Sequence, residues 1–113
     1  MRTSVNLDGT VIPKAHAPEA ATAAVITLAA AVGTRHVVDK VFGSYSAAPT
    51  GGALTIASTV FGAAVSMVIA ITAAGPFDLN FNPPIQGDDN TAITITLASG
   101  AGAVVGKVNA LTR

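Results

Sequence analysis

The residues that could carry out chemistry are few and are scattered along the chain. His16 and His36 are the only histidines, no cysteine is present, and neither histidine has carboxylates at the spacing of a ligand set. Zinc sites in proteins need three or four donors of these types. The sequence therefore predicts no zinc site, and His36, next to Val37, is expected at a strand edge or in a subunit contact.

Asp88, Asp89 and Asn90, together with Asp78, are the one group of oxygen-bearing side chains that could bind a hard cation such as Ca²⁺. Their spacing is not that of an EF-hand loop, and Asp and Asn commonly cap backbone groups in turns. No Gly-x-Ser-x-Gly sequence exposes a nucleophilic serine, and the glycines near residue 100 lack the lysine of a phosphate-binding loop. We expect no bound metal, no cofactor and no enzymatic activity.

Composition indicates one domain that shares its surface with partners. The 113 residues suffice for a single core. Half of them are hydrophobic and only 11% are charged, against about 25% in a typical soluble chain. Obligate interfaces are depleted in charge, so we expect an assembled protein. Six basic and six acidic residues cancel and form no run of like charge, which argues against a nucleic-acid partner.

No charged residue occurs between Lys40 and Asp78, so the apolar part of this stretch resembles a membrane span at first sight. It contains Gly62, Gly75 and Pro76, lacks basic flanks and places β-branched residues at alternate positions, which indicates strands. The amino end has no apolar segment of the kind found in signal peptides. We expect no membrane partner and a protein that stays where it is made.

The stretch between Phe77 and Leu97 contains two segments with the alternation of β-strands. Apolar and polar residues alternate from Phe77 to Asn82 and again from Ile93 to Leu97, which is typical of half-buried strands. Pro83-Pro84 is predicted to end the first strand because proline has no N–H for a ladder. The two strands form either a long-looped antiparallel pair or a crossing from one sheet to another.

Further strands are expected at residues 21–32, 35–46, 53–57, 66–72 and 103–111, with a short strand or bend at 60–64. A slip in the alternation at Asp39-Lys40 predicts a β-bulge. The loop at 47–52 is predicted to join hairpin partners, and Gly106 to allow a close approach. Short strands separated by turn signals, without a convincing helix, predict an antiparallel sandwich or barrel of about eight strands.

Residues 1–20 are predicted to form an extended arm, and residues 21–113 the β-sandwich domain. The arm has few large apolar side chains, and Asp8-Gly9 suits a tiny hairpin within it. A frayed terminus is the alternative. In an arm that lies on a neighbouring subunit, the expected contacts are its apolar residues Leu7, Val11 and Ile12.

Four segments resemble a known family: Ser44 to Ile56, Ile71 to Pro76, Pro83 to Ile85, and Ala103 to Asn109. They are similar to segments of small jelly-roll proteins encoded among the structural genes of tailed bacteriophages, namely capsid decoration or cement proteins and related virion components. The resemblance covers about residues 25–113, through strand-and-turn patterns. It implies an all-β, jelly-roll-like sandwich without an active site, often a homotrimer, that clamps capsid subunits from outside.

The expected function is therefore that of a virion structural protein on the capsid exterior, made in the host cytoplasm, with the major capsid protein and further copies of itself as partners. His36 and Tyr45, the single tyrosine, are expected partner contacts beside those in the arm. Two alternatives stay open. One is a tail, collar or fibre-base component for host attachment, which copy number would distinguish, and the other is a carbohydrate-binding module that uses Tyr45.

Overall fold

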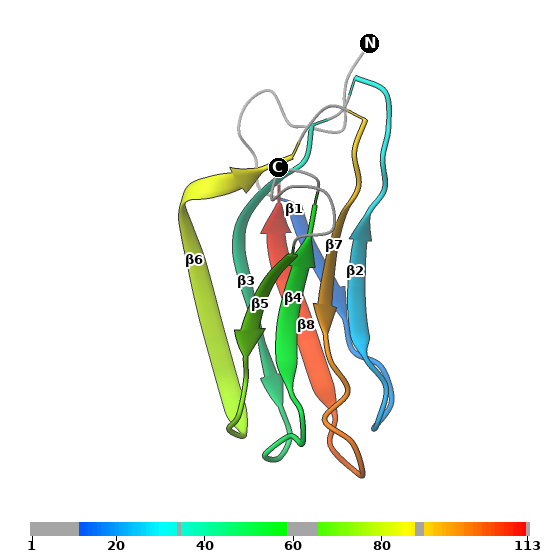
Figure 1. The fold of residues 1–113 in the computed structure, drawn as a ribbon, viewed down its shortest axis with the longest axis vertical. Helices are drawn as coiled ribbons and strands as arrows, with labels where there is room; N and C mark the ends of the chain where they lie inside the picture. The colour runs from blue at the N-terminus through cyan, green and yellow to red at the C-terminus, as the bar shows by residue number, and fades with distance from the viewer. Residues whose placement is uncertain (1–11, 34, 59–65, 88–89, 113) are drawn as a thin grey trace.

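The chain folds as a sandwich of two antiparallel sheets, seen in a computed structural model that describes residues 12–33, 35–58, 66–87 and 90–112 (Figure 1). Within these residues no helix occurs. The strands are β1 (Ile12–His16), β2 (Ala24–Leu28), β3 (Val37–Tyr45), β4 (Ala53–Ala57), β5 (Ser66–Ala70), β6 (Gly75–Gln86), β7 (Ile93–Leu97) and β8 (Gly106–Thr112).

Sheet A has the strand order β1-β8-β3-β6, and sheet B the order β2-β7-β4-β5. Every neighbouring pair is antiparallel. The chain crosses between the sheets at most connections, which gives the interleaved order of a jelly roll. The predicted fold class is confirmed, and β6 and β7 form the crossing between sheets rather than the antiparallel pair.

The core lies between the sheets and follows from the period-2 patterns of the strands. In β7, Ile93, Ile95 and Leu97 are buried and alternate with half-exposed residues, and β4 buries Leu54 and Ile56 in the same way. Successive side chains of a strand point to opposite faces, so each strand offers one apolar face to the other sheet. The buried apolar residues are Ala24, Ile26, Leu28, Val38, Val41, Tyr45, Leu54, Ile56, Ile93, Ile95, Leu97, Val108 and Ala110.

A bulge in β3 and a bend in β6 occur at the same place. Val38 pairs with Ile85 whereas Lys40 pairs with Asn80, so the register shifts at Asp39, where the bulge was predicted. The prediction that Pro83-Pro84 ends the strand was wrong, because β6 continues to Gln86 and bends sharply (Figure 1). Proline has no N–H group to donate. Because β6 is the outermost strand of sheet A, the N–H groups that its two prolines lack interrupt no hydrogen-bond ladder inside the sheet.

The loops at one end of the sandwich are joined by hydrogen bonds. Ser46 N–H donates to Val105 O over 2.9 Å, Val105 N–H donates to Ser46 Oγ over 2.8 Å, and Thr50 N–H donates to Gly100 O over 2.9 Å. These bonds hold the β3–β4 connection against the β7–β8 connection. The predicted hairpin was wrong, since β3 and β4 lie in different sheets.

One long side of the sandwich is closed by contacts between its two sheets. Val25 N–H donates to His16 Nδ1 over 2.9 Å, which links β2 of sheet B to β1 of sheet A. Ile12–His16 lies within the stretch predicted as an arm, but each of its residues pairs with a residue of β8. This part of the predicted arm is therefore a strand of sheet A. Residues 1–11, including the predicted Asp8-Gly9 turn, lie outside the described residues.

Candidate docking surface

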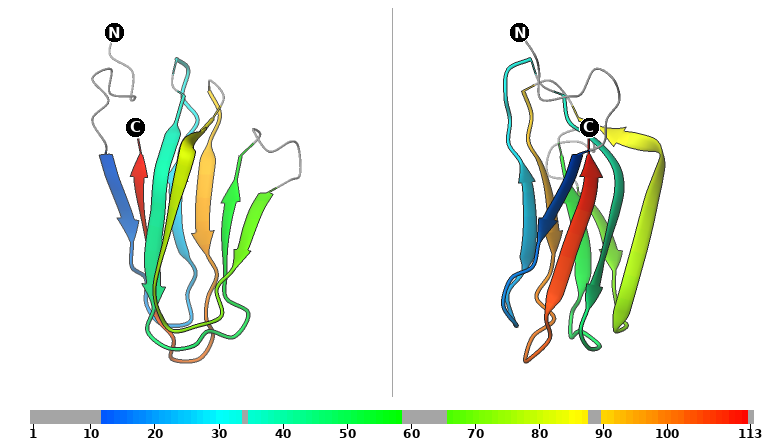
Figure 2. Two further views of the ribbon diagram at one scale, coloured as in Figure 1. Left: turned by 90° about the vertical axis from the view of Figure 1, so that its left-hand side faces the viewer. Right: turned by 180° about the vertical axis from the view of Figure 1, so that it is seen from behind.

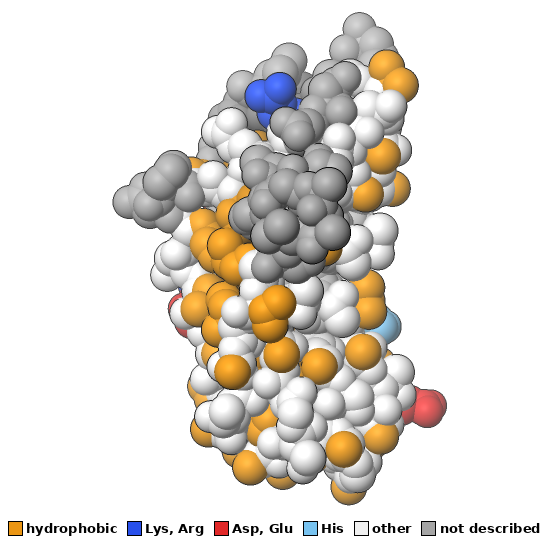
Figure 3. All heavy atoms as spheres, in the orientation of Figure 1, with side chains coloured by type: hydrophobic (Ala, Val, Ile, Leu, Met, Phe, Trp, Pro, Cys, Tyr) orange, Lys and Arg blue, Asp and Glu red, His pale blue; other side chains and the backbone are white. Residues whose placement is uncertain are grey.

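The two sheets differ in the charge that their strands carry. Among the described residues, every charged side chain that belongs to a strand is in sheet A: Lys14, Asp39, Lys40, Asp78 and Lys107. The strands of sheet B carry none. Figure 3 views the molecule from the side of sheet B, and where described residues are in view on this side, apolar and neutral atoms predominate and charged atoms lie at the margins.

Among the described side chains of sheet B, those that point outward, called here the neutral face, are all valine, threonine or alanine. They alternate with core residues in all four strands and are exposed or half-exposed. The neutral face consists of Val25, Thr27, Ala53, Thr55, Ala57, Val68, Ala70, Thr94 and Thr96.

One row of the neutral face crosses the whole sheet. Thr96 of β7 lies opposite Val25 of β2 on one side and Thr55 of β4 on the other, and Thr55 lies opposite Val68 of β5. The valines at the two ends of this row are 38% and 62% exposed. Directly opposed residues have Cβ atoms about 4.5–5.5 Å apart, so the row is a continuous ridge of β-branched side chains.

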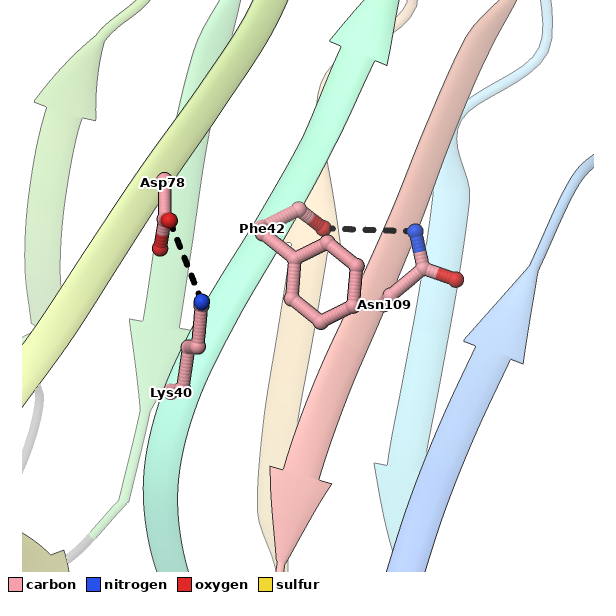
Figure 4. A network of polar contacts seen from close by, with 4 residues as sticks. All are labelled: Lys40, Phe42, Asp78 and Asn109. Carbon is pink, nitrogen blue, oxygen red and sulfur yellow. Dashed lines mark hydrogen bonds and ion pairs between the residues drawn. The ribbon is translucent and has the colours of Figure 1, made fainter.

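The outward face of sheet A carries charged side chains among apolar ones and makes its own contacts (Figure 4). Lys40 Nζ lies 3.1 Å from Asp78 Oδ2 and 5.3 Å from the centre of the Phe42 ring. Asn109 Nδ2 donates a long hydrogen bond of 3.5 Å to Phe42 O. Such charges stay solvated at little cost, so this face is suited to water and the neutral face to a partner.

The chemistry of the neutral face suits docking. Valine and threonine are stiff at χ1 and alanine has no rotamers to lose, whereas ordering a lysine or glutamate costs up to about 2 kcal/mol. No ion has to be desolvated. From strand spacing and rise, four strands of five residues cover roughly 300 Å². A standard interface buries about 800 Å² per partner, so the neutral face alone is too small for a stable complex.

Those predicted partner contacts that the structure describes do not converge on one site. Leu7 and Val11 lie outside the described residues, and Ile12 begins β1, at the opposite edge of the sandwich from β5. His36 is half-buried, and its Nε2 lies 2.8 Å from Ala29 O, so this ring atom already has a partner within the chain.

Tyr45 is a core residue and not a surface contact. Its side chain is 2% exposed, and its hydroxyl donates to Ala98 O over 2.5 Å. Burial raises the pKa of Tyr45, and a hydrogen bond with the backbone of Ala53 acts in the opposite direction. The ring packs over Gly106, where an added Cβ would lie 3.1 Å from Tyr45 Cε1, as the predicted close approach requires. A buried ring offers no platform for a sugar.

The described part of the chain contains no group of three or more His, Cys, Asp or Glu side chains that could hold a metal ion; Asp88 and Asp89 are not among the residues described. Nor does it contain a helix long and apolar enough to cross a membrane.

Comparison with known proteins gave no relative. No family model, no curated protein and no solved structure matches the chain. The neutral face was missed at the sequence level, although its signal was present in the valine, threonine and alanine residues that alternate with the core residues of the four strands.

Proposed function

We propose that the protein is a non-enzymatic structural subunit that docks onto a larger assembly through the neutral face of sheet B. The segregation of charge between the two sheets carries this proposal, since every charged strand residue described lies in sheet A. A charge-poor sheet face that packs on another surface is what interface cores require.

The assembly that we propose is the capsid of a tailed bacteriophage, with the protein as a decoration or cement subunit on its exterior. Two features support this choice: the sequence resemblance to such proteins and the jelly-roll topology, an architecture common in capsid proteins. The fold argument is by analogy, because one fold serves many functions.

In this proposal, reinforcement of the capsid comes from repetition. A face of roughly 300 Å² at about 25 cal/mol per Å² supplies several kcal/mol before the cost of association. That is too little for one isolated contact, so the proposal requires copies that are linked to one another on the capsid. Linked copies bind with an avidity that exceeds the affinity of each contact. The outward face of sheet A, which carries the charges, then points to solvent.

The experiment is co-sedimentation of purified protein with capsids assembled from the major capsid protein of the same genome, without the endogenous subunit. Thr55→Glu places a carboxylate in the middle of the neutral face. Leaving an unpaired charge buried costs about 3–5 kcal/mol, so binding should weaken a hundredfold or more. Ser44→Glu is the matched control, because Ser44 is half-exposed in sheet A and pairs with Lys107.

Two results would contradict the proposal. The first is wild-type protein that does not sediment with capsids at any concentration tested. The second is equal loss of binding by both variants. The proposal also requires hundreds of copies per particle, and a few dozen or fewer in purified virions would favour a tail, collar or fibre-base position.

A further inference from the structure

The free edge of sheet B at β5 differs from the other three free edges of the sandwich. Edge strands expose unpaired N–H and C=O groups, and proteins block them with proline, charge or a covering segment. β1 carries Pro13 and Lys14, and β6 carries Pro76, Pro83 and Pro84 along with exposed Asp78. β5, Ser66–Ala70, has neither proline nor charge.

The fourth edge, β2, is partly covered within the chain. Its Val25 N–H, which points away from sheet B, is bonded to His16 Nδ1 of β1. In contrast, β5 is the outermost strand of sheet B and has no neighbouring strand on its outer side among the described residues (Figure 2, left).

The ladder shows which backbone groups of β5 point outward. Ile71 N–H donates to Gly52 O over 3.1 Å. In an antiparallel pair, residues that hydrogen-bond to the neighbouring strand alternate with residues that do not. Ile69 and Met67 therefore also hydrogen-bond to β4. The N–H and C=O groups of Val68 and Ala70 therefore point away from sheet B. Ala53, opposite Ala70, agrees with this pattern, because its carbonyl accepts a hydrogen bond from the N–H of Ala98, the residue directly after β7.

The inward side chains of β5 are also less covered than those of its neighbour. Met67 and Ile69 pack on the core but stay half-exposed, whereas Leu54 and Ile56 of adjacent β4 are fully buried. A further strand beside β5 would place its own apolar side chains next to them. Among the described residues, no strand lies beside the outer edge of β5, so its backbone groups and its apolar side chains can pair with one more strand of the same kind.

We propose that β5 is a self-association site, at which two copies of the chain pair β5 to β5 in antiparallel orientation about a two-fold axis at Val68. Val68 then exchanges both hydrogen bonds with its counterpart, and the residues two positions away do the same. The two sheets B become one continuous eight-stranded sheet. Their neutral faces lie on the same side, which doubles the docking area.

The symmetry follows from the edges that are available. Antiparallel pairing of a strand with itself is isologous and closes as a dimer, whereas a three-fold ring needs two different complementary edges. The proline, charge and His16 contact on the other edges leave β5 without such a partner. The edge geometry therefore favours a dimer over the homotrimer that the sequence resemblance implies.

Val68→Pro tests the pairing, with Thr27→Pro as its matched control. Val68 N–H points outward from β5, so proline there removes no bond to β4 and edge strands tolerate it. Thr27, two residues after Val25, has the same orientation in β2, at the other edge of the same sheet. Sedimentation equilibrium should give a dimer for the wild type and for Thr27→Pro. Val68→Pro should self-associate at least about thirtyfold more weakly, for the loss of two symmetric hydrogen bonds.

A cross-link tests the register without relying on a disruptive variant. The chain has no cysteine, and residues of a hydrogen-bonded antiparallel pair have Cα atoms about 5.5 Å apart, within disulfide range. Val68→Cys should form a covalent dimer on oxidation, and Thr27→Cys should not. A monomeric or trimeric wild type, or a folded Val68→Pro protein that dimerises normally, would overturn the inference. A dimer that Val68→Cys fails to cross-link would overturn the register. None of these measurements involves capsids, so they are independent of the proposed function.

Discussion

Tyr45 connects the two sheets through one hydrogen bond, and its removal tests whether the ring is a core residue. Tyr45→Phe keeps the ring, which is 2% exposed, and deletes the hydroxyl that donates to Ala98 O over 2.5 Å. Leaving this partly buried carbonyl without its donor costs about 1–3 kcal/mol. For a domain of this size that corresponds to a drop in Tm of roughly 4–12 °C, measured by circular dichroism.

Alkaline pH gives a second readout from the same side chain. Burial raises the pKa of Tyr45 in the folded state above the value of about 10 in the unfolded chain. The stabilisation that this shift supplies is therefore complete below pH 10 and is lost as the pH rises through the folded-state pKa. Tyr45→Phe retains every other titratable group, so the difference between the two proteins isolates the phenol.

The assay is direct because the chain has one tyrosine and no tryptophan. Tyrosinate absorbance reports ionisation of Tyr45 alone, and far-ultraviolet circular dichroism reports the sheets. We expect the tyrosinate signal to appear above pH 10, together with loss of sheet structure. Ionisation near pH 10 with the sheets intact would refute the burial of Tyr45 and return it to the surface, where a sugar-binding role could be considered again.

Two further substitutions test packing and surface charge. Gly43→Ala should destabilise the protein by more than about 3 kcal/mol in urea unfolding, because the added Cβ would overlap Lys107 O, a backbone atom that cannot move aside. Wild-type stability of this variant would mean that β3 and β8 are not this close. Asp78→Asn breaks the ion pair with Lys40. The Asp78 side chain is 55% exposed and that of Lys40 is 29% exposed, so the substitution should change stability by less than about 1 kcal/mol. A loss of several kcal/mol in the same assay would contradict the solvated character of the outer face of sheet A.

The sequence predicted those features that depend on local alternation. The strands β4 and β7, the buried residues within them and the bulge at Asp39 all follow from period-2 patterns and their interruption. The same local reasoning failed at Pro83-Pro84, because the effect of a proline depends on whether its strand is at an edge, and strand order is a long-range property. It failed for the β3–β4 hairpin because two adjacent strands show no local sign of the sheet that each will join.

The misplacement of Tyr45 has a specific cause. In β3 the inward residues are Val38 before the bulge and Val41, Gly43 and Tyr45 after it, so the bulge changes the phase of the alternation. An alternation counted from Val38 without the extra residue places Tyr45 on the outer face. The sequence showed that a slip occurred but not how many residues it involved, and one residue decides which face every later side chain occupies.

The neutral face results from topology acting on several unremarkable segments. The charge-free stretch between Lys40 and Asp78 contains only two of its strands, β4 and β5. β2 and β7 come from outside that stretch, and nothing in their sequences links them to it. The jelly-roll order brings the four together, while the strands with lysine and aspartate form the other sheet. Because β5 also ends this sheet without proline or charge, the same arrangement that makes the face neutral leaves its edge able to pair.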